Sequence, residues 1–247
     1  MLGLTIAATL VPAASLRAAR GATIQAVAFD AFAIFDPRPI AALAERFFPG
    51  RGRELVEAWR TRQFEYQWLR ALSGRYADFQ KSTADALDFA ADLLGLDVPA
   101  DARRELLGSY LKLTAWPDVA DGLMALKQAG LRSALLSNAT PAVLHAGIAS
   151  ARLDGLFEQV LSTDARRTYK PDPRAYRMAV DGLHLRADEI LFVPSAGWDA
   201  AGAKAFGYRT FWVDRMGLPA ERLDLVADGV GRGFGDLLAY LATIRGA

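Results

Sequence analysis

The hydrophobic pattern divides the chain into a first strand, a long helical stretch and a region where strands and helices alternate. Residues 25–32 form an apolar run rich in β-branched and aromatic side chains, typical of a buried parallel strand. From residue 40 to 112 the apolar positions recur at helical spacing, without a strand pattern. Further strands are predicted at 131–136, 159–161, 190–193 and 210–213. This order predicts an α/β fold, a doubly wound parallel sheet with an inserted α-helical cap domain.

Helical spacing and breakers set the expected element bounds. The prolines of residues 35–39 are expected to interrupt regular structure, and Ser82 is a candidate N-cap. Helices are predicted at 54–72, 83–94, 102–113, 119–129, from Pro141, at 174–183 and at 198–206. We therefore expect an α/β core of residues 23–37 and 116–247, and a helical insert of residues 38–115.

The first 22 residues differ from the rest of the chain. An apolar stretch of about a dozen residues precedes Arg17 and Arg20, too short to span a bilayer and typical of a signal h-region. No basic residue precedes it, so the usual positive n-region is absent. We interpret residues 1–22 as an export leader or its remnant, which predicts a periplasmic or secreted protein; the alternative is a cytoplasmic protein with a poorly packed extension.

Composition narrows the classes of partner and cofactor. The chain has 247 residues, 52% of them hydrophobic, and a formal net charge of +1 without runs of like charge. It therefore predicts no nucleic-acid partner and no membrane association of the mature form. There is no cysteine, and the two histidines, His145 and His184, have no second ligand at metal spacing. No metal and no cofactor are expected.

Polar residues follow several of the predicted strands. Asp30 ends the first strand, Ser137 and Asn138 follow the second, Lys170 precedes a helix, and Asp199 follows residues 190–193. In a parallel α/β sheet these positions converge on one crevice, where ligands bind. Each also has a plain structural explanation: Asp and Ser are common caps, and a lysine before proline is usually solvated. Their joint occurrence favours an active site.

These residues occur in motifs that resemble those of the haloacid dehalogenase superfamily, and within it the L-2-haloacid dehalogenases. The motifs, in order, are Phe29-Asp30-Ala31-Phe32, Leu136-Ser137-Asn138, Tyr169-Lys170-Pro171-Asp172 and Trp198-Asp199-Ala200-Ala201-Gly202. The helical insert is also similar, through residues 48–52 and 59–70. The resemblance runs from about Gln25 to the C-terminus and implies a Rossmann-like core with a helical cap.

The resemblance implies a role for each matching residue. Asp30 is the nucleophile that displaces the leaving group at C2 of a small 2-substituted carboxylate and becomes an ester. Lys170 neutralises and orients Asp30, and Asp199 helps to orient the lysine and activate water. The implied substrate-binding residues are Arg60, which grips the halide, with Ser137, Asn138, Tyr176, Phe32 and Trp198.

Position 32 separates this chain from phosphatases of the same superfamily. Those enzymes need a second Asp two residues after the nucleophile, which protonates the leaving oxygen and helps to hold magnesium. This chain has Phe32 there. The sequence therefore predicts neither phosphoryl transfer nor a magnesium requirement.

Three positions depart from the dehalogenase pattern. Ile34 replaces a Thr, and Pro194 and Ala196 replace a Ser and an Asn. Losing one hydrogen-bond donor of this kind costs about 3–4 kcal/mol of transition-state stabilisation. Three interpretations follow: an (S)-2-haloacid dehalogenase, a C–N hydrolase that opens a strained ring such as azetidine-2-carboxylate, or a non-catalytic relative that binds a small acid or acts as a scaffold. A homodimer is one expected form of this protein.

Overall fold

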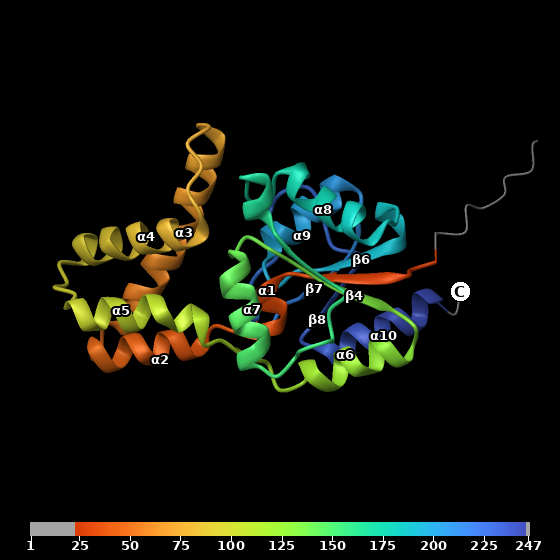
Figure 1. The fold of residues 1–247 in the computed structure, drawn as a ribbon, viewed down its shortest axis with the longest axis horizontal. Helices are drawn as coiled ribbons and strands as arrows, with labels where there is room; N and C mark the ends of the chain where they lie inside the picture. The colour runs from red at the N-terminus through yellow and green to blue at the C-terminus, as the bar shows by residue number, and fades with distance from the viewer. Residues whose placement is uncertain (1–22, 246–247) are drawn as a thin grey trace, which may run out of the picture.

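The computed structural model describes residues 23–245 and contains a six-stranded parallel sheet (Figure 1). The strands, in spatial order, are β5 (Gln159–Ser162), β4 (Arg132–Ser137), β1 (Ala26–Phe29), β6 (Ile190–Val193), β7 (Arg209–Val213) and β8 (Gly229–Gly231). β1 lies between β4 and β6, so its carboxyl end lies where the strand order changes direction. Such a switch point forms a crevice between the loops that leave the strands.

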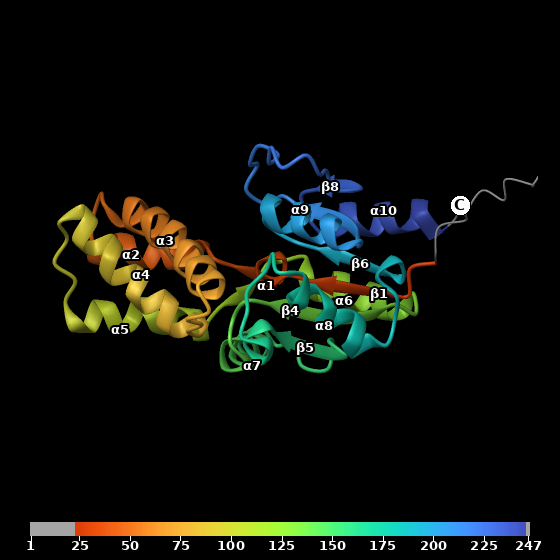
Figure 2. The same cartoon turned by 90° about the horizontal axis from the view of Figure 1, so that it is seen from above.

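Helices cover both faces of the sheet (Figure 2). The core helices are α6 (Val119–Gln128), α7 (Pro141–Ser150), α8 (Pro173–Leu183), α9 (Gly197–Phe206) and α10 (Phe234–Arg245). Val27 and Phe29 of β1 join an apolar cluster with α6, α7 and α10, whereas Ala26 and Ala28 join a second cluster with α8 and α9. Because successive strand side chains point to opposite faces, this apolar run is buried on both sides.

The helical insert lies beside the end of the sheet where β1 terminates, on the left in Figure 1. It consists of α2 (Arg38–Phe47), α3 (Gly52–Leu72), α4 (Phe79–Leu94) and α5 (Ala100–Gly108). The chain leaves the core through β2 (Phe35–Asp36) and returns through β3 (Thr114–Ala115), and these two strands pair antiparallel. The short 3-10 helices are Ser109–Leu111, Thr163–Arg166 and Ala187–Glu189, and α1 is Ala31–Ile34.

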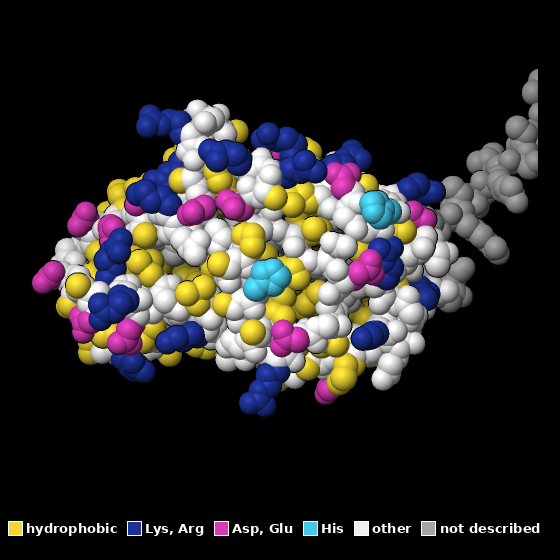
Figure 3. All heavy atoms as spheres, viewed as in Figure 1, with side chains coloured by type: hydrophobic (Ala, Val, Ile, Leu, Met, Phe, Trp, Pro, Cys, Tyr) yellow, Lys and Arg dark blue, Asp and Glu magenta, His cyan; other side chains and the backbone are white. Residues whose placement is uncertain are grey.

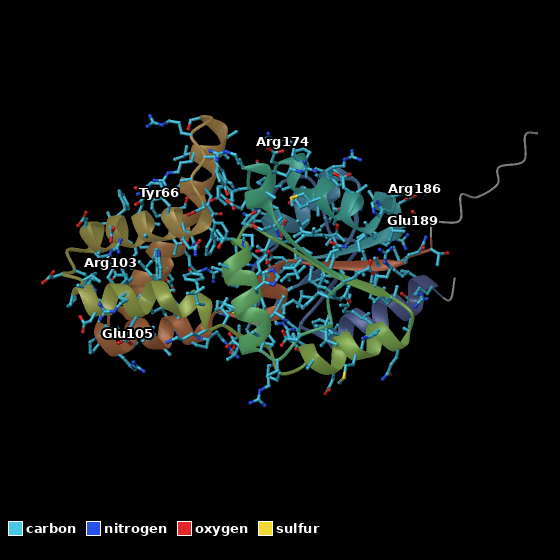
Figure 4. The ribbon with its side chains drawn as sticks, in the orientation of Figure 1. Tyr66, Arg103, Glu105, Arg174, Arg186 and Glu189 are labelled. Atoms are coloured by element: carbon cyan, nitrogen blue, oxygen red, sulfur yellow. The ribbon has the colours of Figure 1, made fainter. Side chains whose placement is uncertain are left out.

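Polar contacts as well as apolar packing join the helices of the insert. The indole of Trp59 in α3 donates to the carbonyl of Thr83 in α4 at 2.8 Å, in a buried position. Arg103 of α5, labelled in Figure 4, donates twice to the carboxylate of Asp88 in α4, at 2.7 and 2.8 Å. The buried bond fixes the crossing of α3 and α4, whereas the exposed pair contributes at most about 1 kcal/mol.

The structure confirms the predicted fold class and corrects several local assignments. Asp78, not Ser82, caps α4, and Ser82 is buried inside that helix. Residues 35–36 form β2 despite the nearby prolines, and Pro39 lies in the first turn of α2, where a missing N–H costs nothing. Neither β8 nor α10 was predicted. The predicted leader, residues 1–22, lies outside the described residues and stays a prediction.

The surface carries charged side chains of both signs. On the face seen in Figure 3, basic and acidic side chains are interspersed, with apolar side chains between them. Within residues 23–245, no helix combines the length and the apolar character needed to cross a membrane.

Candidate active site

Asp30 lies immediately after β1, and each of its carboxylate oxygens has a different partner. Oδ2 accepts the backbone N–H of Phe32 at 2.9 Å and so caps α1. Oδ1 accepts from Nζ of Lys170 at 2.8 Å. The capping interpretation of Asp30 is therefore correct, and the second oxygen remains available for the predicted active-site role. The residue is only 9% exposed.

Lys170 joins the carboxylates of two different strand ends. Its Nζ donates to Asp30 and, at 2.6 Å, to Oδ2 of Asp199, and its side chain is 1% exposed. The alternative interpretation of Lys170 as a solvated loop lysine is therefore wrong. Burial alone would lower the pKa of Lys170, but the charges of Asp199 and Asp30 outweigh it and raise that pKa above its ordinary value. The lysine stays protonated at neutral pH.

Asp199 lies in the first turn of α9 and is fully buried. It does not cap this helix, because the N-cap position is Ala196. Its Oδ1 accepts the hydroxyl of Tyr176 at 2.7 Å. Burial raises the pKa of Asp199 to about 6, a rise that the charge of Lys170 limits. Burial and the carboxylate of Asp199 raise the pKa of Tyr176 well above its usual range, so the phenol stays neutral and donates.

Gly202 of the last motif permits the close approach of α8 to α9. A Cβ at this position would overlap the hydroxyl of Tyr176 and the ring of Pro171. A side chain here would therefore displace the phenol from Asp199. The glycine of the motif is explained by this packing.

Ser137 and Asn138 follow β4, and both are buried. Oγ of Ser137 accepts the N–H of Ala139 at 3.1 Å, so this serine has the turn-forming role that was its structural alternative. Oδ1 of Asn138 accepts the backbone N–H of Lys170 at 2.8 Å, which leaves its amide nitrogen to donate to Oε1 of Gln67 at 3.3 Å. The structure thus places Asn138 between the lysine loop and the helical insert.

Gln67 was not predicted as a site residue. Its amide nitrogen is buried and has no hydrogen-bond partner within residues 23–245. It follows Arg60 by seven residues in α3, a spacing that places both on one face of the helix. That spacing was the available sequence signal, but only the fold shows that this face meets Asn138.

Arg60 and Phe32 meet at the wall of a cavity of about 750 Å³ between the insert and the core. The guanidinium carbon of Arg60 lies 5.7 Å from the centre of the Phe32 ring. The same cavity is lined by Tyr110 of the insert and Met216 of the core. Its charged lining consists of three arginines and two glutamates, Arg38, Arg53, Arg60, Glu45 and Glu57, so positive charge exceeds negative by one.

Trp198 belongs to an aromatic cluster that joins the insert to the core. Its ring lies 5.4 Å from that of Phe64 and 5.3 Å from that of Trp68, both in α3. The indole N–H of Trp68 donates to the backbone carbonyl of Lys170 at 2.9 Å. The cluster borders a different groove from the cavity that contains Arg60 and Phe32, so Trp198 packs beside the charged network instead of lining that cavity.

The three departures from the dehalogenase motifs have distinct surroundings. Ile34 is fully buried in the apolar core and Pro194 is buried at the end of β6. Ala196 precedes α9. Ser195 lies between Pro194 and Ala196 in the sequence, and its hydroxyl donates to Oδ2 of Asp30 at 3.2 Å. Ser195 therefore faces the carboxylate, which the sequence did not establish.

The site combines a carboxylate, a buried cation and a second buried carboxylate. This set is suited to nucleophilic attack by Asp30 and to proton transfer through Lys170 and Asp199. In the described part of the chain, no group of three or more His, Cys, Asp or Glu side chains could hold a metal ion.

Comparisons with known proteins identify the family. A family model described as haloacid dehalogenase-like hydrolase matches residues 9–207. The (S)-2-haloacid dehalogenase of Pseudomonas sp. (strain YL) is 42% identical over 83% of this chain and 89% of its own length. A crystal structure of an L-2-haloacid dehalogenase superposes with a TM-score of 0.88 at 41% identity, covering 90% of this chain and all of the other.

A third relative is a solved structure of the L-2-haloacid dehalogenase from Xanthobacter autotrophicus with chloropropionic acid covalently bound. It has a TM-score of 0.82 at 36% identity and covers 89% of this chain and 99% of its own. The matched family model spans most of the chain, and these relatives share its length as well as its fold. The chain belongs to the haloacid dehalogenase-like hydrolases.

Proposed function

We propose that this protein hydrolyses the carbon–halogen bond of small (S)-2-haloacids and releases 2-hydroxy acids. The observation that carries the proposal is the 2.8 Å contact between Asp30 and the buried ammonium of Lys170. A carboxylate held beside a cation, in a site without a second acid at position 32, is equipped to attack carbon. The relatives named as (S)-2-haloacid dehalogenases support the same substrate class.

In the first step, Asp30 attacks C2 of the substrate. An oxygen of the carboxylate forms a bond to C2, the carbon–halogen bond breaks, and the halide leaves with the electron pair. Arg60, on the cavity wall, receives the developing anion. Asn138 and the N-terminus of α7 bind the substrate carboxylate. The product of this step is an ester between Asp30 and the substrate.

In the second step, water hydrolyses that ester. Water attacks Cγ of Asp30 and transfers a proton to Asp199, whose carboxylate lies 2.6 Å from Nζ of Lys170. The lysine donates a proton to the departing alkoxide and recovers one from Asp199. The net reaction consumes one water and yields the 2-hydroxy acid, halide and a proton.

The helical insert acts as the cap of the site in this proposal. Arg60 and Gln67 come from α3, whereas Asp30, Lys170 and Asp199 come from the core. Closure of the insert over the core would exclude bulk water from the carbon–halogen bond, which strengthens the electrostatic interactions there.

The proposed reaction needs no metal ion, because Lys170 provides the positive charge beside Asp30. Dialysis against EDTA should leave chloride release unchanged, measured against an undialysed sample. A rate that falls on dialysis and recovers with added magnesium would contradict this prediction.

A homodimer is the assembly that we propose. Its support is a group of exposed leucines at the end of α3, where Leu72 is 86% and Leu69 is 59% exposed. Light scattering coupled to gel filtration measures the mass directly. A mass of one chain at micromolar concentration would rule out a stable dimer.

Halide release from the two enantiomers of 2-chloropropionate tests the function. We expect chloride from the (S) enantiomer, and none from an Asp30→Asn variant that folds with an unchanged far-UV spectrum. Azetidine-2-carboxylate, assayed for ring opening, tests the C–N hydrolase interpretation, which the comparisons do not favour. Ring opening without chloride release would favour the C–N hydrolase interpretation over the proposed function. The absence of both activities would favour a non-catalytic relative.

A further inference from the structure

The two carboxylate oxygens of Asp30 accept different numbers of hydrogen bonds from the protein. Oδ1 accepts from Nζ of Lys170 at 2.8 Å. Oδ2 accepts from two donors, the backbone N–H of Phe32 at 2.9 Å and the hydroxyl of Ser195 at 3.2 Å. Oδ1 therefore keeps the freer lone pair, which favours it as the attacking oxygen. Oδ2 becomes the carbonyl oxygen of the ester.

The backbone around Ser195 is tied down on both sides. The carbonyl of Pro194 accepts the N–H of Val213 at 2.9 Å, and the carbonyl of Ser195 accepts the indole N–H of Trp212 at 3.1 Å. The carbonyl of Ala196 accepts the N–H of Ala200 at 3.1 Å in the first turn of α9. Three successive carbonyls are thus anchored, so the hydroxyl of Ser195 is held towards Asp30 before the reaction.

We infer that Ser195 and the N–H of Phe32 form an oxyanion hole for hydrolysis of the Asp30 ester, which makes Ser195 a catalytic residue of the second step. When water bonds to Cγ, the electron pair of the carbonyl moves onto Oδ2, where both donors converge. When the intermediate collapses, the bond from Cγ to Oδ1 breaks and the product leaves as the alkoxide, which Lys170 protonates. The carbonyl at Oδ2 is restored.

The same geometry predicts that Ser195 affects the two steps differently. In the first step Oδ2 loses negative charge as the ester forms, so its donors do not favour that transition state over the free carboxylate. In the second step Oδ2 gains a full charge, and only interactions that strengthen in the transition state accelerate a reaction. Ile34, which is buried in the apolar core, offers no donor that could substitute for Ser195.

Rapid-quench measurements with (S)-2-chloropropionate separate the steps; this experiment rests on the proposed function. For Ser195→Ala we expect a chloride burst of one equivalent at the wild-type rate, followed by turnover about 100- to 1000-fold slower. The ester should accumulate on the peptide containing Asp30, as seen by mass spectrometry. Ser195→Thr, which retains a hydroxyl, should recover turnover, and Ser109→Ala in the insert is the matched control.

The outcomes distinguish the inference from the function on which it rests. Chloride release by the wild type with unchanged turnover of Ser195→Ala would overturn the inference alone. A Ser195→Ala variant slowed equally in burst and turnover would also overturn it, because that result describes a structural role. Wild-type protein that forms neither chloride nor ester would overturn the proposed function and the inference with it.

Discussion

The charged residues of the site form one continuous network through a single lysine. Lys170 contacts Asp30 and Asp199 at once, and Tyr176 donates to the far oxygen of Asp199. Removing any one partner would leave a buried charge unpaired, which costs more than the loss of one surface ion pair. The network therefore holds the nucleophile in one orientation.

The origin of the product oxygen tests the role assigned to Asp30. In a single turnover in heavy-oxygen water, we expect the label to remain on the carboxylate of Asp30, because the oxygen transferred to C2 is its own. Mass spectrometry of the product and of the peptide measures both pools. Direct attack by water, with Asp30 as a general base, would instead label the product in that first turnover.

The raised pKa of Asp199 predicts an acid limb in the rate of ester hydrolysis. Asp199 accepts the proton of water only when ionised, so kcat should fall as the pH drops through about 6. The chloride burst should not show this limb, because Lys170 stays protonated. Asp199→Asn should lose both the limb and most of the turnover; a limb that persists in that variant would contradict the assignment.

The same shift has a consequence for stability with a defined sign. The pKa of Asp199 rises from 3.8 to about 6 on folding, so between these values the folded state binds a proton that the unfolded state has lost. The contribution of Asp199 to the free energy of unfolding is therefore fully present below pH 3.8 and is lost as the pH rises through about 6.

At the scale of elements, the sequence predicted best where apolar runs were long. The strands at β4, β6 and β7 were predicted to within one residue at the strand end that leads to the site, because each is buried and rich in apolar side chains. The predicted apolar run at residues 25–32 extends three residues beyond the end of β1. β8 was not predicted because two of its three residues are glycines. The hydroxyl of Ser82 suits a helix cap, but Asp78 caps the helix about one turn earlier.

The residues of the candidate site also differ in how well the sequence predicted them. Asp30, Lys170 and Asp199 could be predicted because each belongs to a motif near the end of a strand. Ser195 and Gln67 could not be assigned, because their partners, Oδ2 of Asp30 and the amide of Asn138, are 165 and 71 residues away in the sequence. The pairing of β1 with β6 brings Ser195 to Asp30, and the packing of α3 on the core brings Gln67 to Asn138.

Gly52, the first residue of α3, should not tolerate a side chain. A Cβ there would overlap the backbone of Ala44 and Glu45 in α2, and backbone cannot yield as a side-chain end can. We expect Gly52→Ala to lower the free energy of unfolding by about 1–3 kcal/mol. Gly108→Ala in α5, where no atom lies within 4 Å of the added Cβ, is the control. Equal stability of both variants in urea denaturation would contradict the packing argument.

At the scale of the whole molecule, the helical insert and the α/β core both contribute to the site. Few polar contacts join them. One of them is the hydrogen bond from Trp68 of α3 to the carbonyl of Lys170. The aromatic cluster around Trp198 adds apolar contact at the same place. The insert is therefore attached to the loop that carries Lys170.

Trp68→Phe tests the importance of this attachment. Phenylalanine preserves an aromatic ring but removes the hydrogen-bond donor. The free energy that holds the insert against the core should therefore fall by about 0.5–1.5 kcal/mol. We expect KM for (S)-2-chloropropionate to rise up to about tenfold with little change in the chloride burst at saturation. Leu69→Ala, at an exposed neighbouring position, should leave KM unchanged. An unaltered KM in Trp68→Phe would show that this contact does not control closure.

The antiparallel pair of β2 and β3 has a consequence for the order of release. Both chain crossings run side by side in this ribbon, which is anchored to the core where the N–H of Trp116 donates to the carbonyl of Ile34 at 3.0 Å. Arg60 and Gln67 share α3, so any movement of the insert about this ribbon would displace both side chains together. In the proposed function, one opening would then withdraw Arg60 and the contact of Gln67 to Asn138 in a single event. We therefore expect halide and hydroxy acid to depart after the same opening step.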